Sequence, residues 1–180
     1  MENRSRVMAR GITRSVKMMV CGIPNVGKSS LINKIAGRAG AKTGDRPGVT
    51  KSQQWIRLKD GIELLDMPGV LWPKFDSEDV ALRLAYTGAI KDEIMDVEEL
   101  ACLLLEFLNN NYPEELKTRY KLESTDNKKG YEIMEDICLK RGFLLGKGEL
   151  DYFRCANILL DEFRGCKIGK ITLELPPEKE

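Results

Sequence analysis

The sequence contains no histidine, which removes several kinds of chemistry before any motif is considered. Histidine is the side chain whose charge changes nearest neutral pH, and it is a frequent zinc ligand. Its absence therefore excludes histidine bases, Ser-His-Asp triads and most zinc sites. Catalysis by this chain would have to depend on magnesium and on the positioning of its substrate.

Long apolar runs and paired cysteines are absent as well. The longest apolar runs, such as residues 101–105, are far shorter than the roughly 20 residues of a membrane-spanning helix, and the basic N-terminus lacks the apolar stretch of a signal peptide. The five cysteines are odd in number and show no CxxC spacing, which predicts reduced thiols, mostly in a core. We expect a cytoplasmic protein with no membrane partner, and the sequence leaves its oligomeric state open.

The apolar content is nevertheless sufficient for a folded core. With 180 residues, of which 42% are apolar, the chain can form one ordinary domain or two small ones. The net charge of +1 is unevenly distributed, because residues 1–19 and 38–59 are basic whereas residues 60–115 are strongly acidic. The basic stretches are either a solvated surface or a surface that binds nucleic-acid phosphates.

Residues 22–29 read GIPNVGKS, which matches the GxxxxGK[ST] pattern of a phosphate-binding loop. Residues 17–21 before it are a short apolar strand candidate, and residues 28–38 are predicted to form a helix. In such a loop the backbone N–H groups bind phosphate oxygens at the start of the helix, the lysine reaches the terminal phosphates and the hydroxyl holds magnesium. The alternative is a glycine-rich turn that only precedes a helix.

Two further segments follow in the order found in GTPases. Residues 62–65 predict a buried strand that ends at Asp66, and Asp66-Met67-Pro68-Gly69 matches the DxxG pattern, in which the aspartate lies near magnesium and the glycine is a hinge. Residues 43–50 are rich in turn formers and predict a mobile loop whose Thr50 is available to magnesium and to the terminal phosphate. Alone, Thr50 would be an ordinary loop residue, but three motifs in order favour a nucleotide site.

The rest of the sequence predicts three short strands and a helical unit. The strands are expected at residues 17–21, 53–58 and 62–66, and the pattern is helical almost throughout from residue 78 onward. One helix begins after Asp96, which forms a capping box with Glu99. Three helices are each expected to bury one apolar face. The residues on these faces are Val97, Leu100, Leu104, Phe107 and Leu108 for the first helix, Tyr131, Met134, Ile137 and Cys138 for the second, and Leu150, Phe153, Ala156, Leu160 and Phe163 for the third.

Other stretches of this second half are expected to be less regular. Residues 116–130 are polar, and residues 126–130 within them predict a loop. Residues 167–175 predict a short strand before a polar tail. We therefore predict two domains, a phosphate-binding domain at residues 1–77 and a helical domain at residues 78–180.

Four segments together resemble the circularly permuted GTPases of the ribosome biogenesis GTPase A (YlqF) type, namely GIPNVGKSSLINKI, AKTGDRPGVTKSQQW, LLDMPGVLWPKF and LRLAYTGAIKD. The resemblance implies an α/β fold, with a P-loop NTPase sheet followed by a small all-helical C-terminal domain. It implies a GTP-binding and GTP-hydrolysing factor for late assembly of the large ribosomal subunit, whose helical unit contacts ribosomal RNA. The implied cofactors are GTP, Mg²⁺ and K⁺.

The same resemblance implies roles for individual residues. The phosphate-binding residues would be Gly22, Ile23, Pro24, Asn25, Val26, Gly27, Lys28, Ser29 and Ser30, with Gly69 as the hinge. Magnesium would be held by Ser29 and Thr50, with Asp66 in its outer shell. The catalytic residues would be Lys28, Thr50 and Asn25.

Asn25 and Val70 bear on how hydrolysis would proceed. Asn25 resembles an asparagine that helps hold a potassium ion in related GTPases, although it could equally be a polar turn residue. Val70 stands where Ras-like enzymes have the glutamine that orients the attacking water. We therefore expect slow intrinsic hydrolysis that potassium and the ribosomal particle accelerate.

The sequence has no NKxD segment after the phosphate loop, and permuted GTPases carry their guanine-specificity segments before it. Only residues 1–16 precede the first predicted strand, which is too short a stretch for those segments. We therefore expect an incomplete sheet with one open edge, and weak nucleotide binding that is indifferent to the base. Met67 and Ser30 depart from the commonest residues of the family without altering the main chemistry.

Two other functions stay open at this point. The first is a non-catalytic fragment that binds ribosomal RNA and keeps a passive phosphate loop. The second is an ATP-using P-loop enzyme, which is disfavoured because the DxPG segment lacks the adjacent acidic residue that such enzymes often use as a base.

Overall fold

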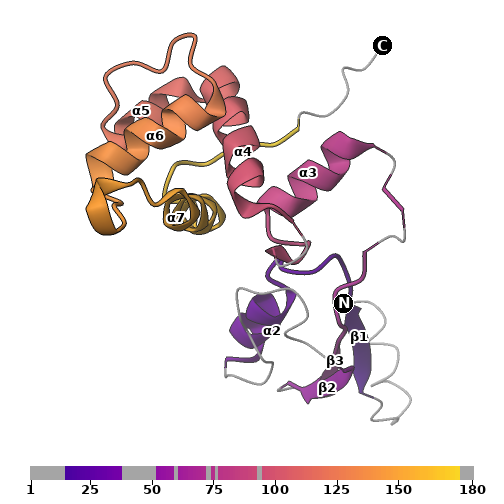
Figure 1. The fold of residues 1–180 in the computed structure, drawn as a ribbon. Helices are drawn as coiled ribbons and strands as arrows, with labels where there is room; N and C mark the ends of the chain where they lie inside the picture. Colours follow the sequence, from indigo (N-terminus) through magenta and orange to yellow (C-terminus); the bar gives the residue numbers. More distant parts are fainter. Residues whose placement is uncertain are drawn as a thin grey trace. The chain divides into compact units, whose positions relative to one another are not determined.

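The computed structural model describes residues 15–37, 52–58, 61–71, 74–75, 77–92 and 95–174 (Figure 1). The chain divides into two compact units, Met1–Lys74 and Phe75–Glu180. The predicted loop at residues 43–50, with Thr50, and most of the two basic stretches lie outside the described residues. No helix among the described residues is long and apolar enough to cross a membrane.

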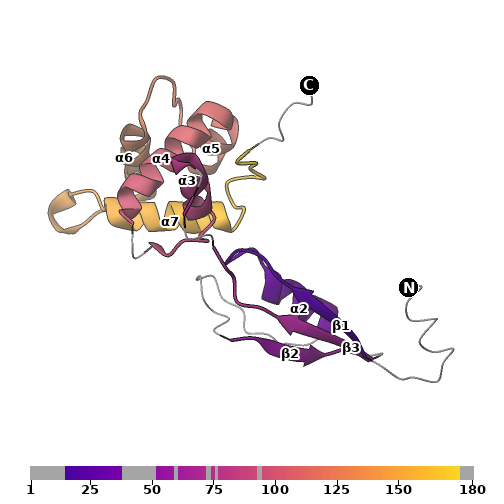
Figure 2. The same cartoon turned by 90° about the vertical axis from the view of Figure 1, so that its right-hand side faces the viewer.

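The first unit contains a three-stranded sheet made of β1 (Val16–Val20), β2 (Gln54–Arg57) and β3 (Ile62–Asp66). The strand order is β1-β3-β2, so that β3 is central (Figure 2). β1 runs parallel to β3, with Val20 opposite Asp66, whereas β2 runs antiparallel to β3, with Gln54 opposite Asp66. The three strands are those that the sequence predicts, with ends that differ by one residue in β1 and in β2.

The helix α2 (Lys28–Ala36) packs on this sheet and supplies the core of the unit. Ile32 of the helix is fully buried against Ile56 and Leu64 of the strands. The helix is shorter than the predicted residues 28–38 because Gly37 adopts a left-handed conformation, with φ of 64°, and ends it. Glycine is favoured at such an end because it has no Cβ to clash there.

The second unit contains five α-helices among its described residues (Figure 1). They are α3 (Glu78–Tyr86), α4 (Val97–Asn111), α5 (Pro113–Tyr120), α6 (Gly130–Arg141) and α7 (Tyr152–Arg164), with a short 3₁₀ turn, η3 (Gly146–Gly148), before α7. α4 packs against each of the other four helices. Its apolar face, which includes Leu100, Leu104 and Leu108, is almost entirely buried, as the sequence predicts.

Local signals explain why α4 begins where it does. The Asp96 side chain accepts hydrogen bonds from the backbone N–H groups of Glu98 and Glu99, at 3.0 and 3.1 Å. This bonding satisfies two of the four N–H groups that a helix start leaves without a partner. The predicted N-terminus of this helix is therefore confirmed.

Residues 116–130 are expected only to be polar, with a loop at 126–130, and no helix is predicted from the sequence at α5. The helix begins with a proline at its first position and two glutamates in its first turn, and Lys121 ends it in a left-handed conformation. Only Leu116 and Tyr120 are buried, so the helix has too few apolar residues to show a periodic pattern. The capping residues were the signal that could have revealed it.

Two of the predicted core positions are also wrong. Tyr131 on α6 is 56% exposed and Phe153 on α7 is 62% exposed. The buried faces of these helices are formed by Ile133 together with the predicted Met134, Ile137 and Cys138 on α6, and by Cys155 and Leu159 together with the predicted Ala156 and Leu160 on α7. The first turn of each helix lies at the edge of the core, where the periodic pattern no longer determines burial.

The predicted strand at residues 167–175 is not formed over its described part, residues 167–174. Ile168 is buried in the helical core, and the hydroxyl of Tyr112 binds both the carbonyl and the N–H of Thr172, at 2.9 and 3.1 Å. A side chain thus replaces the strand partner that the apolar pattern suggested.

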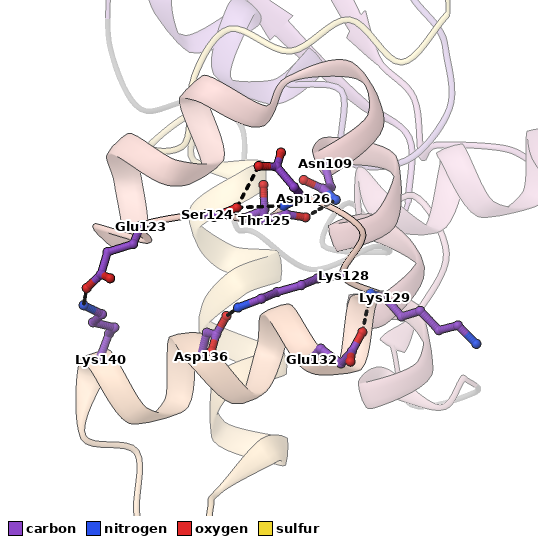
Figure 3. Close-up of polar contacts among 10 residues, drawn as sticks. All are labelled: Asn109, Glu123, Ser124, Thr125, Asp126, Lys128, Lys129, Glu132, Asp136 and Lys140. Carbon is purple, nitrogen blue, oxygen red and sulfur yellow. Dashed lines mark hydrogen bonds and ion pairs between the residues drawn. The ribbon is translucent and has the colours of Figure 1, made fainter.

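The connection between α5 and α6 is held by polar contacts on several sides (Figure 3). The amide of Asn109 on α4 donates to the carbonyl of Thr125 at 3.0 Å, and Lys128 forms an ion pair with Asp136 on α6. Thr125 itself is buried. These contacts fix a loop that was expected only from its polar composition.

All five cysteines are free, and they are less uniformly buried than expected. Cys138 and Cys155 are buried in the helical core, and burial raises the pKa of both thiols. Cys102 is partly buried, whereas Cys21 and Cys166 are exposed. The buried thiols act as small apolar residues, which matches the expectation for this pair.

Candidate phosphate and magnesium site

The candidate site is built around residues 21–27, which connect the C-terminal end of β1 to the start of α2. Two backbone positions determine the shape of this loop. Gly27 precedes the helix with φ of 83°, and Asn25 has φ of 59°. Asparagine is one of the few residues other than glycine that accept this conformation readily. The backbone conformation of the loop therefore explains why position 25 is an asparagine.

Lys28 is held by the loop itself. Its Nζ atom donates to the carbonyl of Gly22 at 3.1 Å and to the carbonyl of Ile23 at 2.7 Å. An ammonium group has three N–H donors. Two of them are used within the loop, so the position of the group is fixed while one donor stays available for an anion.

Asp66 is the buried acidic group of the site. It ends β3, is fully buried, and accepts hydrogen bonds on Oδ2 from Ser29 Oγ at 3.2 Å and from Gln54 Nε2 at 3.3 Å. Its other oxygen, Oδ1, is buried and has no hydrogen-bond partner among the residues that the structure describes. A buried carboxylate oxygen without a partner is unfavourable, and such a group requires an explanation.

The oxygen atoms of Ser29 and Asp66 are suitable ligands for magnesium. Magnesium prefers oxygen ligands, keeps several water molecules and is usually bound through one or two protein groups together with substrate phosphates. The hydroxyl of Ser29 and the unpartnered Oδ1 of Asp66 are of this kind. The described part of the chain contains no cluster of three or more Cys, Asp or Glu side chains able to hold a metal.

The predicted hinge packs directly on the phosphate loop. A Cβ atom at Gly69 would lie 2.5 Å from the Cα and N atoms of Pro24, which is too close for any side chain. The backbone N–H of Val70 donates to the carbonyl of Gly22 at 3.3 Å. Gly69 is therefore required by a close approach between two backbone segments.

The structure brings together most of the predicted site residues. Residues 22–27, Lys28, Ser29, Asp66 and Gly69 lie in one region, although the Val26 side chain in this loop is 54% exposed. Ser30 is an exposed residue of α2. Thr50 lies outside the described residues. Gln54 was not predicted, because its contact with Asp66 depends on the antiparallel register of β2, which the sequence does not display.

Comparisons with known proteins place this chain in a family. Residues 17–135 match the model of a family described as 50S ribosome-binding GTPase. The ribosome biogenesis GTPase A of Bacillus cereus is 48% identical over 178 residues, which cover 98% of this chain and 60% of that protein. The protein of the same name from Thermotoga maritima is 30% identical, over 92% of this chain and 58% of that protein.

A solved structure supports the same relationship. The GDP-bound structure of YlqF from T. maritima superposes with a TM-score of 0.60 at 27% identity, covering 97% of this chain and 67% of that one. The chain spans about three fifths of the length of the curated relatives that it matches. The α/β architecture with a helical C-terminal region agrees with this relationship. The chain belongs to the ribosome biogenesis GTPase A (YlqF) family.

Proposed function

We propose that this chain binds the phosphates and magnesium of GTP and hydrolyses GTP during late assembly of the large ribosomal subunit. The observation that carries the proposal is that the site holds both a pre-positioned Lys28 ammonium and a buried Asp66 carboxylate whose Oδ1 has no partner in the described part of the chain. Family membership supports it. GTP, magnesium and the large ribosomal subunit with its RNA are the corresponding cofactors and partner, in the cytoplasm.

The proposed mechanism assigns binding and positioning to the residues of this chain. The backbone N–H groups of residues 22–30, other than Pro24, which has none, would surround the phosphates at the start of α2. The remaining donor of Lys28 would bind the terminal phosphate. Ser29 and Thr50 would hold magnesium directly, with Asp66 in its outer shell. When bound, magnesium supplies positive charge that offsets the charge developing on the phosphate oxygens.

The first experiment measures GTP hydrolysis by the chain with and without large-subunit particles. We expect slow hydrolysis alone and faster hydrolysis with the particles, and we expect Lys28→Ala to abolish both. Phosphate binding that persists without hydrolysis under either condition would favour the alternative function, a passive phosphate loop on an RNA-binding protein. Parallel titrations with GTP and ATP in magnesium test the expected indifference to the base.

Asn25 is proposed to hold a potassium ion near the phosphates in place of a catalytic glutamine, since Val70 cannot orient water. Its φ of 59° gives a simpler reason for an asparagine, so the two roles need to be separated. Asn25→Gly keeps a residue that accepts this backbone conformation and removes the amide. We expect this variant to bind phosphates normally and to lose the acceleration by potassium over sodium. If the unaltered chain hydrolyses GTP equally fast in potassium and in sodium buffers, potassium has no part in the mechanism.

We also propose that the helical unit contacts ribosomal RNA. The support is a set of exposed aromatic side chains on α6 and α7, Tyr131 and Phe153, with the exposed Lys147 in the turn between these helices. Unpaired bases stack on exposed aromatic rings, and lysines bind the RNA backbone. We expect Phe153→Ala to weaken binding to large-subunit particles several-fold, whereas Trp55→Ala, which removes an exposed aromatic ring from the other unit, leaves it unchanged.

A further inference from the structure

Gln54 has a contact for which the site described so far gives no role. It is the first residue of β2 and lies directly opposite Asp66 of β3 in the antiparallel pairing. Its partly buried side chain donates from Nε2 to Asp66 Oδ2 at 3.3 Å. The same oxygen accepts from Ser29 Oγ at 3.2 Å, so the phosphate-binding helix and the neighbouring strand both bind one carboxylate oxygen.

The distribution of these bonds determines which way the carboxylate faces. The terminal torsion of an aspartate is broad and roughly two-fold, so either oxygen could take either position. Ser29 and Gln54 both donate to Oδ2, which fixes the orientation of the carboxylate. The buried Oδ1 is left without a partner among the described residues. With Ser29 as the only donor, the group would be free to turn and to share both oxygens with that hydroxyl.

We propose that Gln54 is a positioning residue that keeps Oδ1 of Asp66 facing the magnesium site. It acts through Asp66 and touches neither the phosphates nor the ion. This inference rests on the proposed function. Partners in the outer shell of a metal site commonly orient the ligands in this way, and removing one typically lowers metal affinity about 10- to 100-fold.

A purely structural role makes a different prediction. If Gln54 only joins two strands, its loss should weaken the fold of the first unit and reduce nucleotide binding equally with and without magnesium. If it orients Asp66, the loss should appear only when magnesium is present. The dependence on magnesium therefore separates the two roles.

The test uses the full 180-residue chain and a fluorescent GDP analogue. The magnesium concentration that gives half-maximal slowing of nucleotide release is measured for Gln54→Met, which keeps the length of the side chain and removes the donor. We expect this concentration to rise at least about tenfold, with no more than about a twofold change in affinity in EDTA. Gln53→Met alters the exposed neighbour and should behave like the unaltered chain.

A second variant tests the donor itself. In Gln54→His the Nε2–H of the histidine reaches about as far as the glutamine amide and can donate to Asp66. The magnesium concentration for half-maximal slowing of nucleotide release should therefore be close to that of the unaltered chain. Unfolding midpoints of all variants show whether they are folded. An unchanged magnesium dependence in Gln54→Met, or an equal loss in EDTA, would overturn this inference alone, whereas failure of the unaltered chain to bind nucleotide would overturn the proposed function and this inference with it.

Discussion

At the scale of single residues, the buried carboxylate of Glu162 on α7 shows how the helical unit stabilises a charge. Arg119 donates from Nε at 2.9 Å and the hydroxyl of Tyr120 donates at 2.9 Å, while Arg141 lies 4.0 Å away. The Arg119 hydrogen bond, ahead of the bond from Tyr120 and the nearby charges, lowers the pKa of Glu162 below its ordinary value of 4.5. Burial acts in the opposite direction and is outweighed.

This lowered pKa predicts the effect of acid on stability. A carboxylate whose pKa is lower in the folded state stabilises the fold above its ordinary pKa, and that contribution is lost as the pH falls toward the folded value. We expect the free energy of unfolding of the helical unit to fall below about pH 4.5, and Glu162→Gln to reduce this fall. At neutral pH the variant should lose about 2 kcal/mol.

Chemical denaturation at several pH values measures this effect. Glu149→Gln, which alters an exposed glutamate, is the control. The same acid dependence in Glu162→Gln and in the unaltered chain would show that the buried ion pair does not contribute in this way.

Gly69 gives a second prediction for a single residue. A methyl group there would collide with the backbone of Pro24, so Gly69→Ala must displace the hinge or the phosphate loop. Overpacking of this kind typically costs about 1–3 kcal/mol. We expect a lower unfolding midpoint for the first unit and weaker binding of the GDP analogue. Normal binding with a normal midpoint would mean that the two segments can separate without loss.

At the scale of elements, α6 approaches α4 through a glycine. A Cβ atom at Gly130 would collide with the carbonyl group of Cys102, and the Gly130 N–H donates to the carboxylate of Glu106 on α4 at 3.1 Å. No side chain fits between the helices at this point. We expect Gly130→Ala to destabilise the helical unit by about 2 kcal/mol or more.

The matched control for this change is Gly146→Ala in the turn before α7. A Cβ atom there would meet no atom within 4 Å, so the variant should stay within about 0.5 kcal/mol of the unaltered chain. Thermal or urea unfolding compares the two. Similar losses in both variants would show that the close approach of α6 to α4 is not what limits stability.

The elements that the sequence predicted are those whose signal is local. α4 has a capping residue and an apolar stripe along its length, and β3 is an apolar run that ends in an aspartate. α5 was missed because its apolar face is only two residues, and the strand expected at residues 167–175 was wrong because Tyr112, which is distant in sequence, binds that segment. Contacts between distant segments leave no periodic pattern.

In the candidate site too, features with a local sequence signal could be predicted, whereas contacts between distant segments could not. The loop, Lys28 and Asp66 could be recognised because each belongs to a short motif with fixed spacing. The fixed ammonium of Lys28, the packing of Gly69 on Pro24 and the contact of Gln54 arise only when the segments meet in space. The motif thus identifies the chemistry, and the fold determines how each group is held.

At the scale of the whole molecule, the described residues of the two units differ greatly in how many lie in a core. Among the residues that the structure describes, the buried core of the first unit consists of Ile32, Ile56 and Leu64, whereas that of the helical unit contains 20 residues. Opening free energies are lowest where few apolar contacts protect the backbone. We expect amides of β1 and α2 to exchange with solvent much faster than those of α4 and α7.

Hydrogen exchange followed by mass spectrometry tests this expectation. Magnesium and GDP should slow exchange in the first unit, because a ligand that binds only the folded state stabilises it in proportion to its binding. Protection of β1 and α2 equal to that of α4 without any ligand would contradict the expectation. A gain of protection confined to the helical unit would contradict the assignment of the nucleotide site.

The pairing of β2 with β3 indicates one way in which the protein could misfold. Side chains alternate between the two faces of a strand, so a shift of β2 by one residue would turn Gln54 away from Asp66 and present Gln53 or Trp55 at the opposite position. Every motif would still be present in such a misfolded chain, and its composition and helix content would be unchanged. Assays that detect only the folded helices would count these molecules as intact. If Gln54 positions Asp66 as proposed, such molecules would need about tenfold more magnesium to slow nucleotide release, so a second and weaker magnesium response would reveal the misaligned strand.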